Sequence, residues 1–272
     1  MKPVIQVSGE SFLYSCAFDK TYTYEKFVPE HVLAYQISGQ TQIYHQRGEV
    51  LLEEGQVLLA RRNQFAKSIK IPAPEKKYQC ISVLLTNDRL QQFALDNDIY
   101  CEERYHRNRN ILLEPNNLLK GYFLSVISYT ESGRPVSKKL ASIKVNEAIT
   151  LLLEMRPDLE SFLFDFSDPY KQNLEEFMLK NFHYNAPIEH FARLSGRSLT
   201  SFKREFADIF KTSPGTWLKG KRLSEAYYLI KKKSQKPQDI YLDLGFENLS
   251  HFYTAFKKKY GVTPGEITLK SK

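Results

Sequence analysis

The pattern of apolar and polar residues changes after Leu85, about a third of the way along the chain. Up to that residue, short apolar runs alternate with turns that contain Gly or Pro. This pattern predicts antiparallel strands, and so many short strands favour a β-sandwich or barrel. Residues 1–30 are expected to add one or two strands. The other expected strands are His31–Ile37, Thr41–His45, Glu49–Leu52, Gln56–Ala60, Ala66–Ile71 and Tyr78–Leu85.

Beyond Leu85 the apolar residues recur every three or four positions, which predicts helices. A short helix is expected at Asp88–Asp96. Two longer apolar stripes predict helices at Asn116–Tyr129 and Lys138–Glu154, and a turn at 132–135 would join them as an antiparallel pair. The pair either only covers the β-region or also carries a dimer interface.

A boundary between two domains is expected at 165–169, which gives domains 1–168 and 169–272. An aromatic-rich segment there gives way to Ser-Asp-Pro, and a new helix is expected at about 170–182. Each domain would have its own core, since the 272 residues are enough for two.

The second domain contains one pattern twice, at a constant offset of 50 residues. An ungapped repeat indicates one supersecondary unit used twice. Each copy predicts helix, tight turn, helix, at about 187–210 and 237–260, and Thr216–Lys233 is expected to be a linker helix between them. The matched positions are Pro187/Pro237, Glu189/Asp239, Leu194/Leu244, Ser198/Asn248, Phe202/Phe252, Phe206/Phe256, Phe210/Tyr260 and Ser213-Pro214-Gly215/Thr263-Pro264-Gly265.

The positive charge of the chain is confined to the part that holds this repeat. The whole chain has a formal net charge of +8. Residues 170–272 hold 19 Lys and Arg against 10 Asp and Glu, a balance of +9, whereas residues 1–169 hold 20 against 21, a balance of −1. An evenly spread charge would be an ordinary solvated surface. Its confinement to repeated helices favours a polyanionic partner such as nucleic acid.

In the first copy, the second helix is expected to present a basic face. Gly196 suits the end of the preceding helix, and Ser198 suits the N-cap of the next one. The aromatic residues, one every four positions, would face inward. On the opposite side Thr200, Lys203 and Arg204 stand together near the helix start, where a recognition helix presents side chains to base edges.

The second copy places hydroxyl groups on the equivalent face. Asp239–Leu244 is expected to be its first helix, ended by Gly245, and Asn248 its N-cap. The lysines at 257–259 suit phosphates, although lysine runs are also common on solvated faces. His251 could equally be a surface or capping residue. The candidate DNA contacts of this copy are Leu249, Ser250, His251, Tyr253, Thr254, Lys257 and Lys258.

Other kinds of chemistry find little support in the sequence. Cys16, Cys80 and Cys101 form an odd, scattered set without a CxxC motif, so neither a disulfide framework nor a zinc finger is expected. The chain has no apolar run of about 18 residues and no signal-peptide core at its start. A cytoplasmic protein without membrane association, metal, cofactor or catalytic residues is expected.

Residues 239–246, 250–252 and 256–264 resemble the C-terminal signature of the AraC/XylS family of bacterial transcription regulators. The resemblance implies two helix-turn-helix units on a linker helix, binding double-stranded DNA, with RNA polymerase as a further partner. It assigns base reading to Thr200, Lys203, Arg204, Leu249, Ser250, His251 and Thr254. Many members have alanine where Tyr241-Leu242 stands, which suggests altered packing, and the short side chains of the second copy suggest weaker discrimination of bases.

The β-region resembles the cupin-like regulatory domain common in this family, with Leu51–Leu59 as a hairpin that turns at Gly55. Such domains bind a small effector, dimerise or dock a regulatory protein. His31 and His45 stand alone without an His-x-His pair, so no metal site is expected. The expected fold is therefore α+β: a cupin-like antiparallel β-barrel with a helical pair, then an all-α domain.

The sequence thus predicts a sequence-specific DNA-binding transcription regulator, an activator rather than an enzyme, controlled through its N-terminal domain. Base discrimination is expected mainly from the first copy and backbone anchoring mainly from the second. Two alternatives stay open: a cupin-type metalloenzyme with an appended helical domain, and a non-specific architectural DNA binder.

Overall fold

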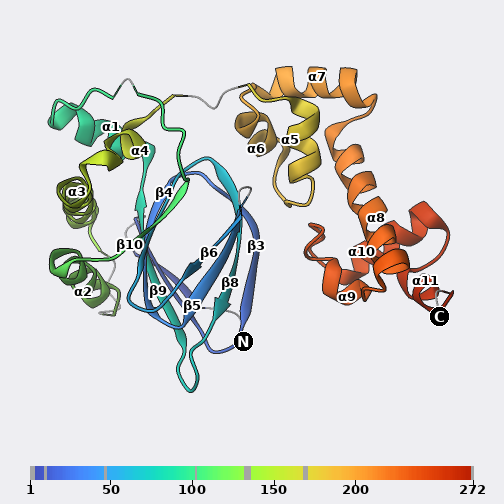
Figure 1. The fold of residues 1–272 in the computed structure, drawn as a ribbon, viewed down its shortest axis with the longest axis horizontal. Coiled ribbons are helices and arrows are strands. Elements are labelled where there is room, and N and C mark those ends of the chain that lie inside the picture. The colour runs from blue at the N-terminus through green and yellow to red at the C-terminus, as the bar shows by residue number, and fades with distance from the viewer. Residues whose placement is uncertain are drawn as a thin grey trace. The chain divides into compact units, whose positions relative to one another are not determined.

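The computed structural model describes residues 4–8, 11–45, 48–101, 103–131, 136–167 and 171–270. Contacts divide the chain into two compact units (Figure 1). The first comprises Met1–Thr23 and Val28–Ser167, and the second comprises Tyr24–Phe27 and Asp168–Lys272. The expected turn at 132–135 and the expected boundary at 168–169 lie outside the described residues. None of the described helices has the length and apolar character that a membrane span needs.

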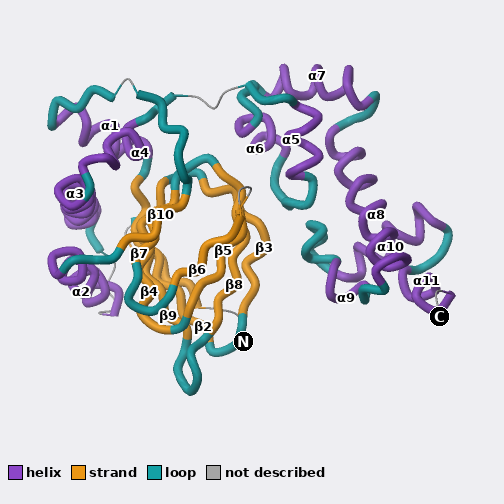
Figure 2. Tube along the Cα trace, in the orientation of Figure 1, coloured by secondary structure: helices purple, strands orange, loops and turns teal. Residues whose placement is uncertain are grey.

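The first unit is built on two antiparallel sheets (Figure 2). One has the strand order β1-β2-β9-β4-β7-β10 and the other the order β3-β8-β5-β6. The expected antiparallel β-region is confirmed, but as two sheets and not as one closed barrel. The strands are β1 (Val4–Ser8), β2 (Phe12–Ala17), β3 (Thr21–Val28), β4 (His31–Ser38), β5 (Gln40–His45), β6 (Gly48–Leu52), β7 (Val57–Ala60), β8 (Gln64–Ile71), β9 (Tyr78–Leu85) and β10 (Asn110–Leu113).

The hairpin predicted at Leu51–Leu59 is wrong. β6 pairs with β5 in the four-stranded sheet, whereas β7 pairs with β4 and β10 in the six-stranded sheet. The chain therefore crosses from one sheet to the other here. Gly55 has a φ of +84° in the crossing, and its N–H donates to the carbonyl of Gln36 at 2.9 Å.

Side chains of the six-stranded sheet point alternately to two cores, as the period of two requires. Leu33 on β4 packs in the core shared with the helices, and its neighbour Ala34 packs in a smaller core with Leu52 of the other sheet. The face toward the helices is strongly apolar, and Tyr35 stacks on Phe123 of α2 with ring centroids 4.9 Å apart.

Helices follow the last long strand of the first unit. The expected pair is confirmed as α2 and α3, where Lys144 Nζ of α3 donates to Ser125 Oγ of α2 at 2.8 Å. β10, η1 and α4 are not expected from the sequence, because each is very short. The elements are α1 (Asn87–Asp96), α2 (Asn117–Glu131), α3 (Lys138–Met155), the short 3₁₀ helix η1 (Pro157–Leu159) and α4 (Glu160–Phe164).

A buried polar cluster fastens the end of the first unit to its sheets. Arg61 Nη2 donates to Asp165 Oδ2 at 2.6 Å, and Arg62 Nη2 donates to the Asp165 carbonyl at 2.8 Å. Burial by itself would raise the pKa of Asp165, but hydrogen bonds from Ser167, Arg61 and the Tyr105 amide outweigh it and lower the pKa to about 2. The carboxylate is therefore held in its charged form.

From residue 171 onward the regular elements that the structure describes are all helices, and they form two halves that repeat one arrangement. The helix expected at about 170–182 is shorter, since it begins at Leu174, and residue 170 lies outside the described residues. The elements are α5 (Leu174–Asn181), α6 (Ile188–Leu194), α7 (Leu199–Phe210), α8 (Pro214–Lys233), α9 (Pro237–Ile240), α10 (Leu249–Tyr260) and α11 (Pro264–Lys270).

Candidate nucleic-acid interface

The first helix-turn-helix consists of α6 and α7, and its turn forms where the sequence predicts it. The chain leaves α6 at Ser195, and Gly196 adopts a φ of +73°. The Ser198 side chain then accepts a hydrogen bond from the Ser201 N–H, so the expected N-cap is confirmed. A capping oxygen of this kind satisfies one of the free N–H groups at a helix start.

An aromatic core fixes the orientation of α7 about its axis. Phe202 and Phe206 are fully buried, and the Trp217 ring lies 4.7 Å from that of Phe210, between centroids. This packing leaves Thr200, Lys203 and Arg204 exposed on the other side of the helix. The three side chains that the sequence singles out are therefore brought together on one accessible face.

Glu205, an acidic residue next to this face, is neutralised by its neighbours. Glu205 follows Arg204 directly, and its carboxylate is 2.9 Å from Lys171 Nζ and 3.0 Å from Arg197 Nε. The hydrogen bond from Lys171, with that from Arg197, lowers the pKa of Glu205. The Glu205 charge is thus balanced by two cations beside it.

The second helix-turn-helix consists of α9 and α10. α9 is shorter than expected and begins earlier: it spans Pro237–Ile240, whereas the sequence predicts a helix at Asp239–Leu244, and the residues after it form a hydrogen-bonded turn. Gly245 has a φ of +77° in that turn. Asn248 Oδ1 accepts from the His251 N–H at 2.8 Å, which confirms the second N-cap.

Most of the candidate contacts on α10 are exposed, but two are not. Ser250, His251, Thr254, Lys257 and Lys258 are exposed to solvent. Leu249 and Tyr253 are half-buried and pack against the core of the second half, so only part of each side chain is accessible.

Lys259, the third lysine of the run, has a different environment. Its Nζ donates to the Gly220 carbonyl at 2.6 Å and to Ser224 Oγ at 2.8 Å, both on α8. The sequence alone gives all three lysines at 257–259 the same candidate role, contact with phosphates. The structure instead ties the third lysine to the linker helix, which leaves Lys257 and Lys258 for a partner.

α8 joins the two halves and belongs to both. It spans 20 residues, a length of roughly 30 Å at 1.5 Å per residue. Ser213 caps its N-terminus, and its later apolar residues Leu223, Ala226 and Ile230 lie in the second core. The linker is therefore a packed helix and not a free tether.

A groove of about 600 Å³ runs beside α8 between the two halves. Its walls include Leu218 of α8 and Phe246 of the second turn, and its lining also includes Lys219, His251 and Lys258. Candidate contacts of the second half thus border an open, basic concavity, a shape that suits a polyanion backbone.

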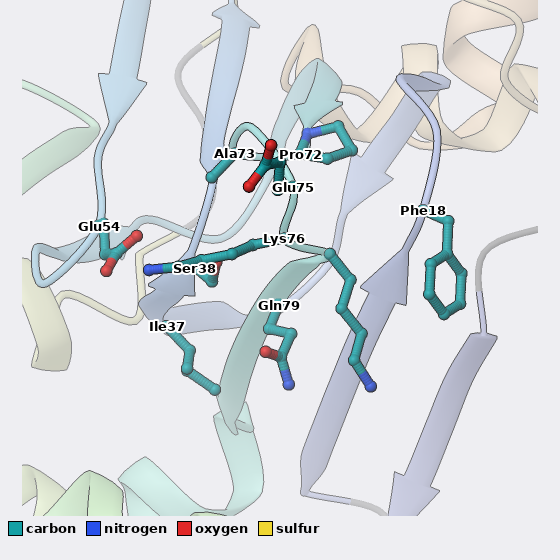
Figure 3. A pocket seen from close by; sticks show the side chains of 10 residues that line it. Phe18, Ile37, Ser38, Glu54, Pro72, Ala73, Glu75, Lys76 and Gln79 are labelled. Atoms are coloured by element: carbon teal, nitrogen blue, oxygen red, sulfur yellow. The ribbon is translucent and has the colours of Figure 1, made fainter.

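The first unit has an open pocket of about 700 Å³ at one end of the sheets (Figure 3). Phe18 and Ile37 give it apolar surface, and two lysines and two glutamates give it charges of both signs. Ser38 also lines it: this residue is buried, and its hydroxyl has no hydrogen-bond partner among the described residues. A buried hydroxyl without a partner is costly unless a ligand or water satisfies it.

His31 and His45, the two histidines of the β-region named in the sequence analysis, lie in different sheets. His31 Nε2 donates to the Phe162 carbonyl at 3.0 Å, and His45 is the last residue of β5. Within the described ranges, no group of three or more His, Cys, Asp and Glu could hold a metal ion.

Sequence reasoning misses the roles of Arg222, which joins the two halves, and of Lys259, which ties α10 to α8. In the sequence Arg222 is one of several basic residues of the linker helix, but in the structure it is half-buried and bonded to three carbonyls. No local signal marks such a residue, because its acceptors lie 23 to 40 positions away in the chain.

Two family descriptions match separate parts of the chain. Residues 31–164 match the ExsA N-terminal regulatory domain, and residues 191–269 match a helix-turn-helix domain. The first match covers most of the β-region with its helices, and the second covers both helix-turn-helix units except for the start of α6.

Characterised relatives are similar over parts of their length. The HTH-type transcriptional regulator ExsA of Pseudomonas aeruginosa is 29% identical over 127 residues, which cover 46% of each chain. The virulence regulon transcriptional activator VirF of Yersinia enterocolitica is 29% identical over 99 residues, 36% of each chain. The chain thus matches less than half the length of these two relatives. The HTH-type transcriptional regulator MtrA of Neisseria gonorrhoeae is 23% identical over 192 residues, 64% of this chain and 63% of MtrA.

Similar solved structures include ToxT of Vibrio cholerae, at 14% identity and a TM-score of 0.46, over 98% of this chain and 100% of ToxT. The DNA-binding domain of AdpA in complex with a target DNA is 22% identical with a TM-score of 0.34, over 38% of this chain and 93% of that domain. With a regulatory-domain match over the first unit and a helix-turn-helix match over the second, the chain belongs to the AraC/XylS family of transcription regulators.

Proposed function

We propose that the protein is a sequence-specific DNA-binding transcription regulator that places α7 and α10 in successive major grooves. The observation that carries the proposal is the repeated geometry. In both halves a side-chain N-cap starts the second helix, a buried aromatic stripe fixes its rotation, and polar side chains near its start are exposed. Recognition helices present their N-terminal residues to base edges in this way.

The exposed residues suit different roles in the two halves. Arg204 can donate two hydrogen bonds to guanine O6 and N7, and Lys203 and Thr200 add a donor and a hydroxyl. On α10, Ser250, His251 and Thr254 offer short polar contacts, and the accessible parts of Leu249 and Tyr253 could meet a thymine methyl or a backbone oxygen. Lys257 and Lys258 suit phosphates, which position the protein without reading sequence.

The proposal is tested by competition. Labelled promoter DNA upstream of a gene that the protein controls in its host is bound by the purified full chain, and unlabelled promoter or scrambled DNA of equal length is added. For a sequence-specific regulator, unlabelled promoter DNA should displace the labelled DNA at far lower concentrations than scrambled DNA does. Equal competition would support a non-specific architectural binder instead.

We further propose activation, through contact with RNA polymerase, as the result of DNA binding. VirF of Yersinia enterocolitica, which is 29% identical over 99 residues, is described as a transcriptional activator. We also propose that the protein works in the cytoplasm and has no catalytic activity. Metal analysis of the purified protein tests the remaining alternative, since a cupin-type metalloenzyme would retain a stoichiometric metal.

Control through the first unit is proposed to use either a small effector or a protein partner. The pocket of Figure 3 favours a small effector with a polar group, because its lining combines the Ser38 hydroxyl, which has no partner among the described residues, with two lysines and two glutamates. Native mass spectrometry of protein purified from its own host would show a retained ligand, and it would also show whether the chain forms a homodimer. A ligand-free mass would favour the protein partner.

A further inference from the structure

One guanidinium connects the two helix-turn-helix units. Arg222 lies in the middle of α8, and its Nε and Nη2 donate to the carbonyls of Phe182 and Tyr184, each at 2.7 Å. Its Nη1 donates to the carbonyl of Gly245 at 3.2 Å. The first two acceptors lie in the loop between α5 and α6, and the third lies in the turn between α9 and α10. The same side chain therefore holds both halves.

The geometry of this contact is restrictive. A guanidinium is planar and presents its donors in a fixed fork, so three bonds to three carbonyls determine its position and theirs. Gly245 is also in close contact with the same group. A Cβ on that residue would lie 2.6 Å from the His183 carbonyl oxygen and 3.0 Å from Arg222 Cζ. The second turn therefore packs directly on the arginine and on the loop of the first half.

The other polar contacts near this junction are weaker candidates for holding the halves together. Asn185 Nδ2 donates to Glu247 Oε1 at 3.1 Å, but this pair is exposed. Lys259 fastens α10 to α8 without touching the first half. Hydrogen bonds between exposed groups contribute little to stability, whereas those made by a charged donor to half-buried carbonyls are stronger.

We propose that Arg222 is a positioning residue that sets the distance and angle between α7 and α10, and so restricts the protein to one spacing between the two halves of its DNA site. The inference rests on the proposed function. Two rigidly connected helix-turn-helix units can bind at the same time only to DNA whose two subsites have the matching spacing. Loosely connected units tolerate several spacings. One additional base pair moves a subsite by about 3.4 Å and rotates it by roughly a tenth of a turn.

The test compares the wild-type full chain with Arg222→Gln and Arg222→Lys on three duplexes. One carries both subsites at the natural spacing, and the others carry one base pair more or one base pair fewer between them. We expect wild type to lose at least about tenfold in affinity on either altered duplex. Arg222→Gln should reduce this preference to about threefold or less, and Arg222→Lys should lie between the two because it keeps the charge but loses the fork.

A fourth duplex with one subsite scrambled shows whether each variant keeps its base preferences, and Glu247→Ala serves as a control that should keep the wild-type spacing preference. If Arg222→Gln binds specifically and still discriminates spacing as wild type does, the inference is wrong. If neither variant folds, the affinities of the wild-type protein for the three duplexes are the test. Equal affinity for all three spacings overturns the inference. A wild type that prefers no sequence at all would instead contradict the proposed function.

Discussion

Arg204 and Lys257 are both exposed basic residues on second helices of the repeat, yet the proposed function gives them different tasks. Arg204 stands in the second turn of α7, on the face with Thr200, whereas Lys257 stands in the last turn of α10. Residues near the start of a recognition helix reach base edges, and residues further along meet the backbone. Under the proposed function, Arg204 would therefore read bases and Lys257 would anchor the protein to the DNA backbone.

Replacing Arg204 with Ala should lower affinity for the natural site by roughly 1–3 kcal/mol and relax preference at one base position. Lys257→Ala, the matched control, should weaken binding to all sequences by a similar factor and reduce the salt slope by about 1. Fluorescence anisotropy with single-base variants of the site, at several salt concentrations, separates the two effects. An Arg204→Ala protein that keeps every base preference would remove this residue from the reading face.

The buried His31 makes the first unit sensitive to acid. Burial, and then the nearby charges of Arg62, Arg61 and Arg109, lower the pKa of His31 to about 3. An unfolded histidine titrates near 6.5, so below that pH the unfolded chain binds a proton that the folded chain does not. Stability should therefore fall by about 1.4 kcal/mol per pH unit as the pH drops from about 6 toward 3.

Urea unfolding of the full chain between pH 7 and pH 4, followed by far-UV circular dichroism, measures this slope. His31→Gln keeps a donor for the Phe162 carbonyl and should flatten the slope. Asp165→Asn is the control. Since the pKa of Asp165 is lowered to about 2, its contribution is complete above about 4 and is lost only as the pH falls further. This variant should be less stable at pH 7 but retain the slope.

At the scale of elements, the sequence predicts those parts whose pattern is local. The spacing of apolar residues predicts the buried aromatic stripes and the long helices of the first unit. The capping side chains predict the two helix starts. Strand partners do not follow, because pairing is decided between distant segments. β6 and β7 look like a hairpin in sequence, yet each finds a better partner in a different sheet.

The candidate site shows the same division. Which residues face outward on α7 could be predicted from its aromatic stripe. Partial burial of Leu249 and Tyr253 could not, because it depends on how α10 packs against the rest of the second core. The Arg222 contacts likewise exist only once α8 has brought separate segments together.

The turn of the second helix-turn-helix should be far less tolerant of substitution than a similar turn nearby. Gly245 and Gly261 have almost the same φ, +77° and +75°, but a Cβ would clash only at Gly245. Gly261→Ala should cost about 1–2 kcal/mol, the usual strain of a left-handed residue. Gly245→Ala should cost clearly more, because the backbone of His183 must also move.

Urea unfolding of both variants, followed by helical circular dichroism, gives the comparison. The difference between the two free energies of unfolding isolates the clash from the backbone strain that they share. Equal destabilisation would mean that the packing of Gly245 on the first half adds nothing.

At the scale of the molecule, charge and architecture divide the work between two units. The basic residues are concentrated in the helical unit, with a balance of +9 over residues 170–272 and −1 before them. The first unit holds the β-sheets, the pocket of Figure 3 and a buried polar cluster at its end. This division suits the proposed function, in which the second unit binds DNA and the first unit controls it.

The central claim is that two similar helices read two sites on one face of DNA. Selection from a pool of random duplexes by the full chain, followed by sequencing of the bound DNA, tests it and needs no known target gene. We predict an enriched motif of two blocks whose centres lie about 10 base pairs apart, one helical turn. A single block, or no enrichment over the starting pool, would contradict the claim.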